Sequence, residues 1–161
     1  MNTRPYEALL ARMPVSGTRE ERMQRAVDAL WDALHTTGVS WIGFYLALPG
    51  KDEMILGPRR DKPACSPIGL HGACGRSLVS KRALVVTDVA RLGEGYIACD
   101  PRDRSEVVLP LFSADGSSWG VLDADSYEVG SFTQADAFSL STLMRRAGLC
   151  AGSGPLPVDT V

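Results

Sequence analysis

The feature that most constrains the fold is a pair of apolar segments at residues 106–112 and 119–125. Both are rich in the branched aliphatic residues that favour β-strands. Asp115 and Gly116 lie between them, and an Asp-Gly step is a strong signal of the tight turn that joins two antiparallel strands. The sequence therefore predicts an antiparallel hairpin over these two segments.

Three further segments have the composition of strands. Residues 40–47 are rich in aromatic and branched side chains, and a Pro-Gly turn follows them. Residues 54–56 are expected to form a short partner strand, which the Gly-Pro step at residues 57–58 stops. Residues 83–87 alternate in character and predict a further strand.

Helical spacing and capping residues mark the helices. Thr18 and Glu21 can form a capping box at the start of one helix, which Gly38 ends. Thr133 can cap the last helix, with Asp136 in its first turn. Two shorter helices are expected at residues 6–13 and 74–80.

The order of these elements predicts the fold class. Strands that are neighbours in sequence favour an antiparallel sheet, so we expect an α+β fold with helices packed on such a sheet. The chain has 161 residues, the usual size of one domain, and 45% of them are hydrophobic, which is enough for a buried core. The domain is expected over residues 1–150, followed by a loose, flexible tail at residues 151–161 that is rich in Gly, Ser and Pro.

Charge and hydropathy exclude several classes of protein. Seventeen basic and nineteen acidic residues give a net charge of -2, so nucleic-acid binding is not expected. No apolar stretch reaches the roughly 18 to 20 residues of a membrane span, and no signal-peptide core follows the N-terminus. We therefore expect no membrane association and a cytoplasmic location. Phosphate-loop, dinucleotide-binding and α/β-hydrolase motifs are absent from the sequence.

Four cysteines are unusual in a compartment that keeps thiols reduced, so metal binding or thiol chemistry is favoured over a disulfide framework. Cys65, Cys74 and Cys99 lie in segments rich in Gly and Pro. With His71 they could supply a zinc site, although the sequence has no Cys-Xaa-Xaa-Cys pair, and we expect no metal. Cys150, at the end of the last helix, is expected to pack as a small apolar residue.

Three acidic residues fall on the predicted hairpin. Glu106 opens one strand, whereas Asp123 and Asp125, two residues apart on the other, point to the same face of the sheet. Clustered carboxyl groups raise one another's pKa, so one of them can stay protonated and act as an acid. The alternative is that the two aspartates lie on a solvated face of the sheet.

Seven short segments resemble, in order, the motifs of the free methionine-(R)-sulfoxide reductases, a family of GAF domains. The resemblance covers roughly residues 20 to 148, and it implies a six-stranded antiparallel sheet with helices packed against it. The segments are Trp41–Tyr45, Leu56–Pro58, Ala64–Cys65, Gly72–Gly75, Tyr96–Asp100, Ser105–Pro110 and Gly120–Ser126.

The resemblance implies roles for three cysteines. Cys99 matches the nucleophile, Cys74 the resolving cysteine, and Cys65 a further cysteine of the disulfide relay. The segment between Cys65 and Cys74 is one residue shorter than in the family, which leaves open which of these two resolves. Tyr96 stands where a histidine is common.

The resemblance also implies the walls of a substrate pocket. Glu106, Asp123 and Asp125 match the acidic residues near the sulfoxide oxygen and the substrate ammonium. Trp41 and Tyr45 match the aromatic wall. These five residues, together with the three cysteines, are the candidate site residues.

The residues suit this chemistry. A sulfoxide is reduced when a thiolate attacks its sulfur while an acid protonates its oxygen, and the resulting sulfenic acid condenses with a second thiol. No flavin or nicotinamide motif is present, so we expect no cofactor, free methionine sulfoxide as substrate, and an external dithiol such as thioredoxin as reductant. The sequence also permits a homodimer.

The alternative function is a non-catalytic GAF module that senses or binds a small molecule. GAF domains bind many small molecules, and a fold alone does not establish a function. Three cysteines in loops favour the reductase, because a binding module has little use for them.

Overall fold

A sheet of seven strands forms the centre of the molecule, in the order β3-β2-β1-β6-β5-β4-β7. In this computed structural model, which describes residues 3–96 and 99–161, neighbouring strands are antiparallel except β4 and β7, which are parallel. The strands are β1 (Val39–Ala47), β2 (Glu53–Arg60), β3 (Ile68–Gly69), β4 (Ala83–Val86), β5 (Ser105–Phe112), β6 (Ser118–Ser126) and β7 (Val158–Thr160).

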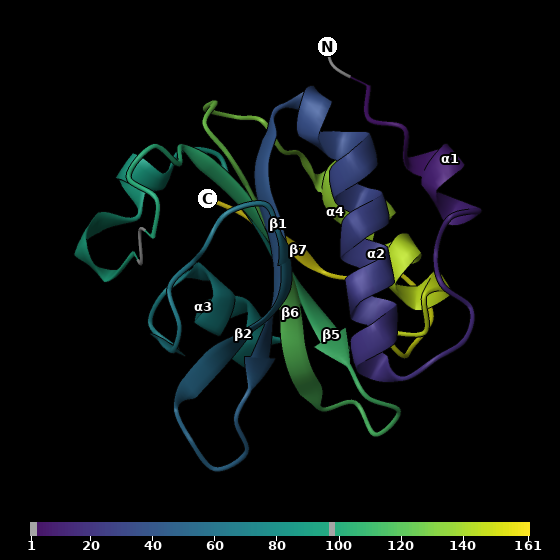
Figure 1. The fold of residues 1–161 in the computed structure, drawn as a ribbon. Coiled ribbons are helices and arrows are strands. Elements are labelled where there is room, and N and C mark those ends of the chain that lie inside the picture. The colour runs from purple at the N-terminus through teal and green to yellow at the C-terminus, as the bar shows by residue number, and fades with distance from the viewer. Residues whose placement is uncertain (1–2, 97–98) are drawn as a thin grey trace.

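Helices cover both faces of the sheet (Figure 1). Three of them lie on one face, and α3 lies on the other together with the long segments that precede and follow it. The helices are α1 (Tyr6–Leu10), α2 (Arg19–Leu34), α3 (Ala73–Ser80) and α4 (Gln134–Arg146), and short 3-10 turns are η1 (His35–Thr37), η2 (Val89–Arg91) and η3 (Gly93–Gly95).

The main core lies between the sheet and the helices α1, α2 and α4. Phe44 of β1 and Leu30 of α2 are fully buried there. Both predicted helix starts are confirmed, since the Thr18 hydroxyl accepts a hydrogen bond from the Glu21 N–H at 3.2 Å and Thr133 forms a capping box with Asp136. These caps satisfy N–H groups that a helix leaves free at its first turn.

The predicted hairpin is confirmed as β5 and β6, with Leu109 directly opposite Leu122. Because side chains alternate across a sheet, one set of hairpin residues enters the main core and the other faces α3. Val108 and Val121 belong to the second set, in a smaller core on the α3 side. The candidate site lies on this second face.

The second predicted strand is longer than the sequence indicates. The Gly57–Pro58 step does not end β2, which continues to Arg60. The register with β1 shifts here, so Gly57 and Pro58 together lie opposite Phe44 in a bulge. A bulge tolerates proline because one residue is left out of the hydrogen-bond ladder.

The prediction of six antiparallel strands is wrong, because the sheet has seven strands and is mixed. Two strands, β3 and β7, were not predicted from the residues. Strand β3 pairs with β2, whereas β7 lies in the segment predicted as a loose tail and pairs in parallel with β4. Leu156, just before β7, is buried against the main core. Strand β7 has only three residues and directly follows Pro157, so no periodic pattern marks it in the sequence.

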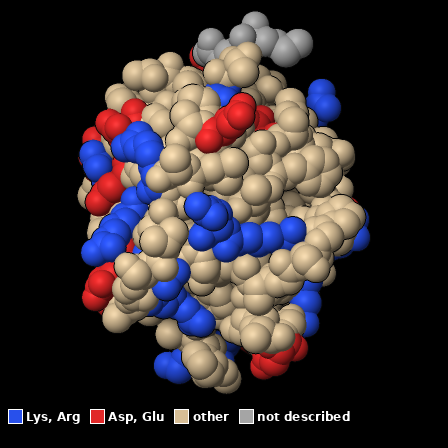
Figure 2. Space-filling model, turned by 90° about the vertical axis from the view of Figure 1, so that its right-hand side faces the viewer, with Lys and Arg blue, Asp and Glu red and all other residues tan. Residues whose placement is uncertain are grey.

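Lys and Arg side chains are spread over the face shown in Figure 2, on the side of α1 and α2. At least one of the arginines of α2 is structural, since Arg22 donates to the carbonyl oxygens of Gly17 at 2.9 Å and of Ala147 at 3.0 Å. It thereby joins the start of α2 to the end of α4. Within the described part of the chain, no helix has the length and apolar character needed to cross a membrane.

Candidate active site

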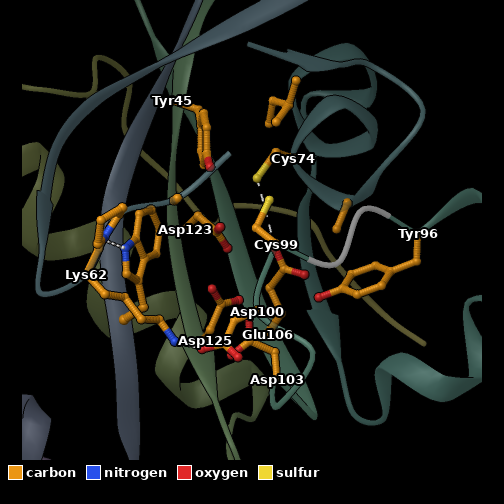
Figure 3. A pocket seen from close by; sticks show the side chains of 15 residues that line it. Tyr45, Lys62, Cys74, Tyr96, Cys99, Asp100, Asp103, Glu106, Asp123 and Asp125 are labelled. Atoms are coloured by element: carbon orange, nitrogen blue, oxygen red, sulfur yellow. Dashed lines mark hydrogen bonds and ion pairs between the residues drawn. The ribbon is translucent and has the colours of Figure 1, made fainter. Parts of the chain in front are cut away.

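Two neighbouring strands place the predicted acidic residues in one cavity on the α3 side of the sheet (Figure 3). Glu106 of β5 lies directly opposite Asp125 of β6, and Asp125 lies opposite Trp41 of β1. Asp123, two residues before Asp125, faces the same side and lies opposite Gly43. The register of β1, β6 and β5 therefore brings together residues that are far apart in the sequence.

The predicted aromatic wall also holds a neighbouring loop. Trp41 and Tyr45 line the cavity with ring centroids 6.0 Å apart. The Trp41 indole N–H donates to the Lys62 carbonyl at 3.0 Å, and the Tyr45 hydroxyl donates to the Cys65 carbonyl at 2.9 Å. Gly43 makes room for the indole, because a Cβ atom at Gly43 would lie 2.6 Å from the Trp41 ring.

Among the described residues, two buried carboxyl groups of the cavity have unpaired oxygen atoms. Glu106 and Asp123 are buried, and Glu106 Oε2 and Asp123 Oδ1 accept no hydrogen bond from any described residue. Burial raises the pKa of Glu106, and burial followed by the charges of Asp125 and Glu106 raises the pKa of Asp123. Burial and the charge of Glu106 likewise raise the pKa of Asp125. The cluster therefore retains a proton more readily than exposed carboxyl groups do.

Two of the three predicted cysteines form a disulfide, Cys65 to Cys99, with Cα atoms 5.5 Å apart. The resemblance gave Cys74 as the resolving cysteine, but the partner of Cys99 in this structure is Cys65. Cys74 is a free, buried thiol at the start of α3. Burial, followed by the charges of Asp123 and Glu106, raises the pKa of Cys74 well above its usual value, which makes it a poor nucleophile.

The zinc set considered from the sequence is not assembled, since Cys65 and Cys99 are bonded to each other. A different group is compact. Ligand atoms of Cys74, Glu106 and Asp123 lie within 4.8 Å of one another, with the Cys74 sulfur 3.9 Å from Glu106 Oε1. In the part of the chain that the structure describes, this is the one such group close enough to contact a single small cation, and an ammonium group is one such cation.

Sequence reasoning missed Lys62, Asp100 and Asp103, which also line the cavity. Asp100 directly follows Cys99, so two carboxylates within four residues of a candidate nucleophile were a usable signal. The ammonium of Lys62 pairs with Asp100, and the Tyr127 hydroxyl donates to Asp100 at 3.0 Å. The middle of the Tyr96–Asp100 motif, residues 97 and 98, lies outside the described residues.

Comparisons with known proteins agree with this geometry. A family model for the GAF domain matches residues 16–150. The free methionine-R-sulfoxide reductase of Saccharomyces cerevisiae is 34% identical over 127 residues, which cover 76% of this chain and 70% of the yeast protein. The chain belongs to the GAF-domain family of free methionine-(R)-sulfoxide reductases. The enzyme of the same name from Escherichia coli is 39% identical over 110 residues, covering 67% of this chain and 64% of that protein.

Solved structures place the chain in the same reductase family. The free methionine-R-sulfoxide reductase of Neisseria meningitidis, determined in complex with its substrate, superposes with a TM-score of 0.75 at 34% sequence identity. The superposition covers 88% of this chain and 81% of the Neisseria chain. The reductases of this family are oxidoreductases.

Tyr96 is where this chain departs from the family pattern within the cavity, and Cys150 is the cysteine that lies away from the cavity. Tyr96, where the family commonly has histidine, lines the cavity and points its hydroxyl toward the carboxyl cluster (Figure 3). Burial, followed by the charge of Glu106, raises the pKa of Tyr96, so this phenol stays protonated at neutral pH.

Cys150 packs at the edge of the main core, where its sulfur accepts the Phe112 N–H at 3.4 Å, as expected for a cysteine that packs as a small apolar residue.

Proposed function

We propose that this chain reduces free L-methionine-(R)-sulfoxide to methionine, with Cys99 as nucleophile and Cys65 as resolving cysteine. The observation that carries the proposal is the Cys65–Cys99 disulfide at a cavity that also contains Glu106, Asp123 and Asp125. A reactive thiol and a protonated acid within one pocket are the two groups that sulfoxide reduction needs.

The chemical step transfers one oxygen atom. The Cys99 thiolate attacks the sulfur of the sulfoxide, while a carboxyl group of the cluster protonates the oxygen. The products are methionine and a Cys99 sulfenic acid. The Cys65 thiol then attacks the Cys99 sulfur, water leaves, and the disulfide forms. The raised pKa values of Asp123 and Asp125 support a protonated acid in the cavity.

The charge of the cavity supports an amino acid as substrate. Five carboxyl groups line it, and Lys62, the basic residue of the lining, already pairs with Asp100. A site of this charge favours the ammonium group of a free amino acid, which is missing when methionine lies within a peptide. Backbone N–H groups of the surrounding loops are the proposed partners of the substrate carboxylate.

The second half of the cycle reduces the disulfide. An external dithiol of the thioredoxin type attacks one sulfur of the pair and releases both thiols by exchange. Cys99 is solvent-exposed and Cys65 is partly exposed, so an attacking thiolate can reach the disulfide. The chain needs no cofactor for this step.

The test is a steady-state assay with thioredoxin, thioredoxin reductase and NADPH, in which methionine is measured directly. We expect turnover of free L-methionine-(R)-sulfoxide and little turnover of the (S) epimer or of the N-acetylated (R) substrate. Cys99→Ser is expected to be inactive, whereas Cys150→Ser, its matched control, keeps full activity. Absence of methionine from every substrate would overturn the proposal, and tight binding of the sulfoxide without turnover would indicate the non-catalytic module instead.

A further inference from the structure

The two disulfide-bonded cysteines lie in separate irregular segments. Cys65 lies between β2 and β3, and its segment is fixed to β1 by the hydrogen bonds from Trp41 to Lys62 and from Tyr45 to the Cys65 carbonyl. These bonds do not involve the sulfur atoms. The position of Cys65 is therefore held whether or not the disulfide is present.

The segment of Cys99 is held in a different way. It precedes β5, and the carboxylate of Asp100 joins it to its surroundings. Asp100 pairs with Lys62 of the Cys65 segment, and it accepts the Tyr127 hydroxyl at 3.0 Å and Arg102 at 3.0 Å. Among the described residues, Lys62 with Asp100 is the ion pair that links the two cysteine segments directly.

The Lys62–Asp100 pair is partly shielded from solvent, whereas Tyr127 lies at the surface. The side chain of Asp100 is 11% exposed and that of Lys62 is 26% exposed, so water and salt screen their attraction less than that of a surface pair. The Lys62 ammonium also lies 4.7 Å from the centre of the Tyr127 ring and 2.6 Å from the Tyr127 hydroxyl. Hydrogen bonds from Arg102 and Lys62 lower the pKa of Asp100 well below its usual value, against an opposing effect of burial, so the carboxylate is charged.

We propose that Lys62, Asp100 and Tyr127 form a noncovalent clamp that positions Cys99 against Cys65 while both thiols are reduced. Without the disulfide, closing a loop between residues separated by 34 positions costs conformational entropy. The clamp reduces that cost beforehand and raises the effective concentration of one thiol near the other. These three are positioning residues, because the clamp acts on the cysteines and not on the substrate.

The role of the clamp in turnover rests on the proposed function. When Cys99 carries a sulfenic acid, the clamp keeps the Cys65 thiol within reach, so the disulfide closes before a second oxidation can occur. A sulfenic acid that waits too long is oxidised further to a sulfinic acid, which thioredoxin does not reverse. The clamp thus protects the nucleophile during each cycle.

The first test does not depend on sulfoxide reduction. The reduced chain is equilibrated with glutathione disulfide, where the two chain thiols form the disulfide and two glutathione thiols are released. We expect the equilibrium constant to fall by about tenfold in Lys62→Met and in Asp100→Asn. The double variant should fall by much less than the two single effects combined, since both single variants remove the shared Lys62–Asp100 pair. Arg82→Met, which removes the exposed Arg82–Asp159 pair away from the cavity, is the matched control.

The outcomes distinguish a positioning role of these residues from a general effect on folding. Tyr127→Phe keeps the ring of an exposed residue and removes one hydroxyl, so it should lower the constant by about two- to threefold without unfolding the chain. Equal constants in wild type, Lys62→Met and Tyr127→Phe would overturn the clamp. So would a decrease in Arg82→Met as large as that in Lys62→Met.

The second test follows a single turnover with free L-methionine-(R)-sulfoxide and traps sulfenic acid with dimedone. We expect Tyr127→Phe, whose side chain does not line the cavity, to form methionine at the wild-type rate but to yield about two to three times more trapped Cys99 sulfenate. Unchanged trapping would overturn the role of the clamp in turnover. If wild type forms no methionine, the proposed function fails, and the glutathione equilibrium still decides whether the clamp exists.

Discussion

Glu106 and Asp125 lie directly opposite each other on the antiparallel strands β5 and β6, where Glu106 is buried and Asp125 is partly buried. Like charges at directly opposite positions destabilise a sheet, and burial increases the cost of each charge. In this site both pKa values are raised, which lets the pair keep a proton instead of two charges. A pair of carboxyl groups that faces a cavity and shares a proton is a suitable acid for a departing oxygen.

Asp125→Asn tests the acid. The substitution keeps the shape of the side chain but removes the transferable proton, so the chemical step should slow by about 10² to 10⁴. The free energy of unfolding should not fall, because one member of a repelling pair becomes neutral. The measurement is the single-turnover rate of methionine formation beside the unfolding midpoint. An unchanged rate with a large drop in the midpoint would assign Asp125 to the fold and leave Glu106 as the acid.

Cys65→Ser and Cys74→Ser distinguish the two candidate resolving cysteines. Cys65→Ser should form one methionine per chain, accumulate Cys99 sulfenic acid, and lose most recycling by thioredoxin. Cys74→Ser should still form the Cys65–Cys99 disulfide, since the Cys74 thiol is free and its pKa is raised. Peptide mapping after one turnover reads both results. If Cys74→Ser rather than Cys65→Ser stops disulfide formation, Cys74 resolves.

Trp41→Phe tests the aromatic wall. The substitution removes the indole hydrogen bond to Lys62 and part of the cavity lining, so the Michaelis constant should rise by about three- to tenfold and stability should fall by about 1 to 3 kcal/mol. Phe44→Leu is the matched control, because Phe44 lies on the same strand but enters the opposite core. It should lower stability alone. A Michaelis constant that stays at the wild-type value in Trp41→Phe would make Trp41 a core residue only.

Asp103→Asn tests the pH dependence of stability. Burial is the main cause that raises the pKa of Asp103 to about 6, so the folded chain binds this proton more tightly than the unfolded chain does. The stability that Asp103 contributes is therefore greatest below its unfolded pKa of about 4 and falls as pH rises to about 6. Asp103→Asn should gain about 1 kcal/mol over wild type at pH 7.5, after allowance for solvent screening, and almost nothing at pH 4. Urea unfolding at both pH values measures the difference, and an equal effect at the two values would contradict it.

Local signals predicted much of the sheet. The Asp-Gly turn and the period of two identified the hairpin and the shared face of Asp123 and Asp125, because both follow from backbone geometry. The end of β2 was predicted wrongly, since a bulge lets a proline remain within a strand. Strands β3 and β7 were missed because each has only two or three residues, and the pairing of β7 with β4 is a long-range contact without a local pattern.

The site residues could be predicted where the family resemblance supplied them. The prediction was incomplete where the role of a residue depends on contacts between distant segments. Cys65, Cys99 and Glu106 were named, but the choice between Cys65 and Cys74 as the partner of Cys99 was left open. That choice depends on how two loops fold toward each other, which the spacing of cysteines does not determine. Lys62 was missed for the same reason, because its relation to Asp100 exists only in three dimensions.

The most direct test of the account is a single turnover without any reductant. Fully reduced chain is mixed with excess free L-methionine-(R)-sulfoxide, and methionine, remaining thiols and disulfide-linked peptides are quantified. The account predicts one methionine per chain, the loss of two thiols, and one disulfide between Cys65 and Cys99, with Cys74 and Cys150 still free. The absence of methionine, or methionine formed without the loss of thiols from Cys65 and Cys99, would contradict it.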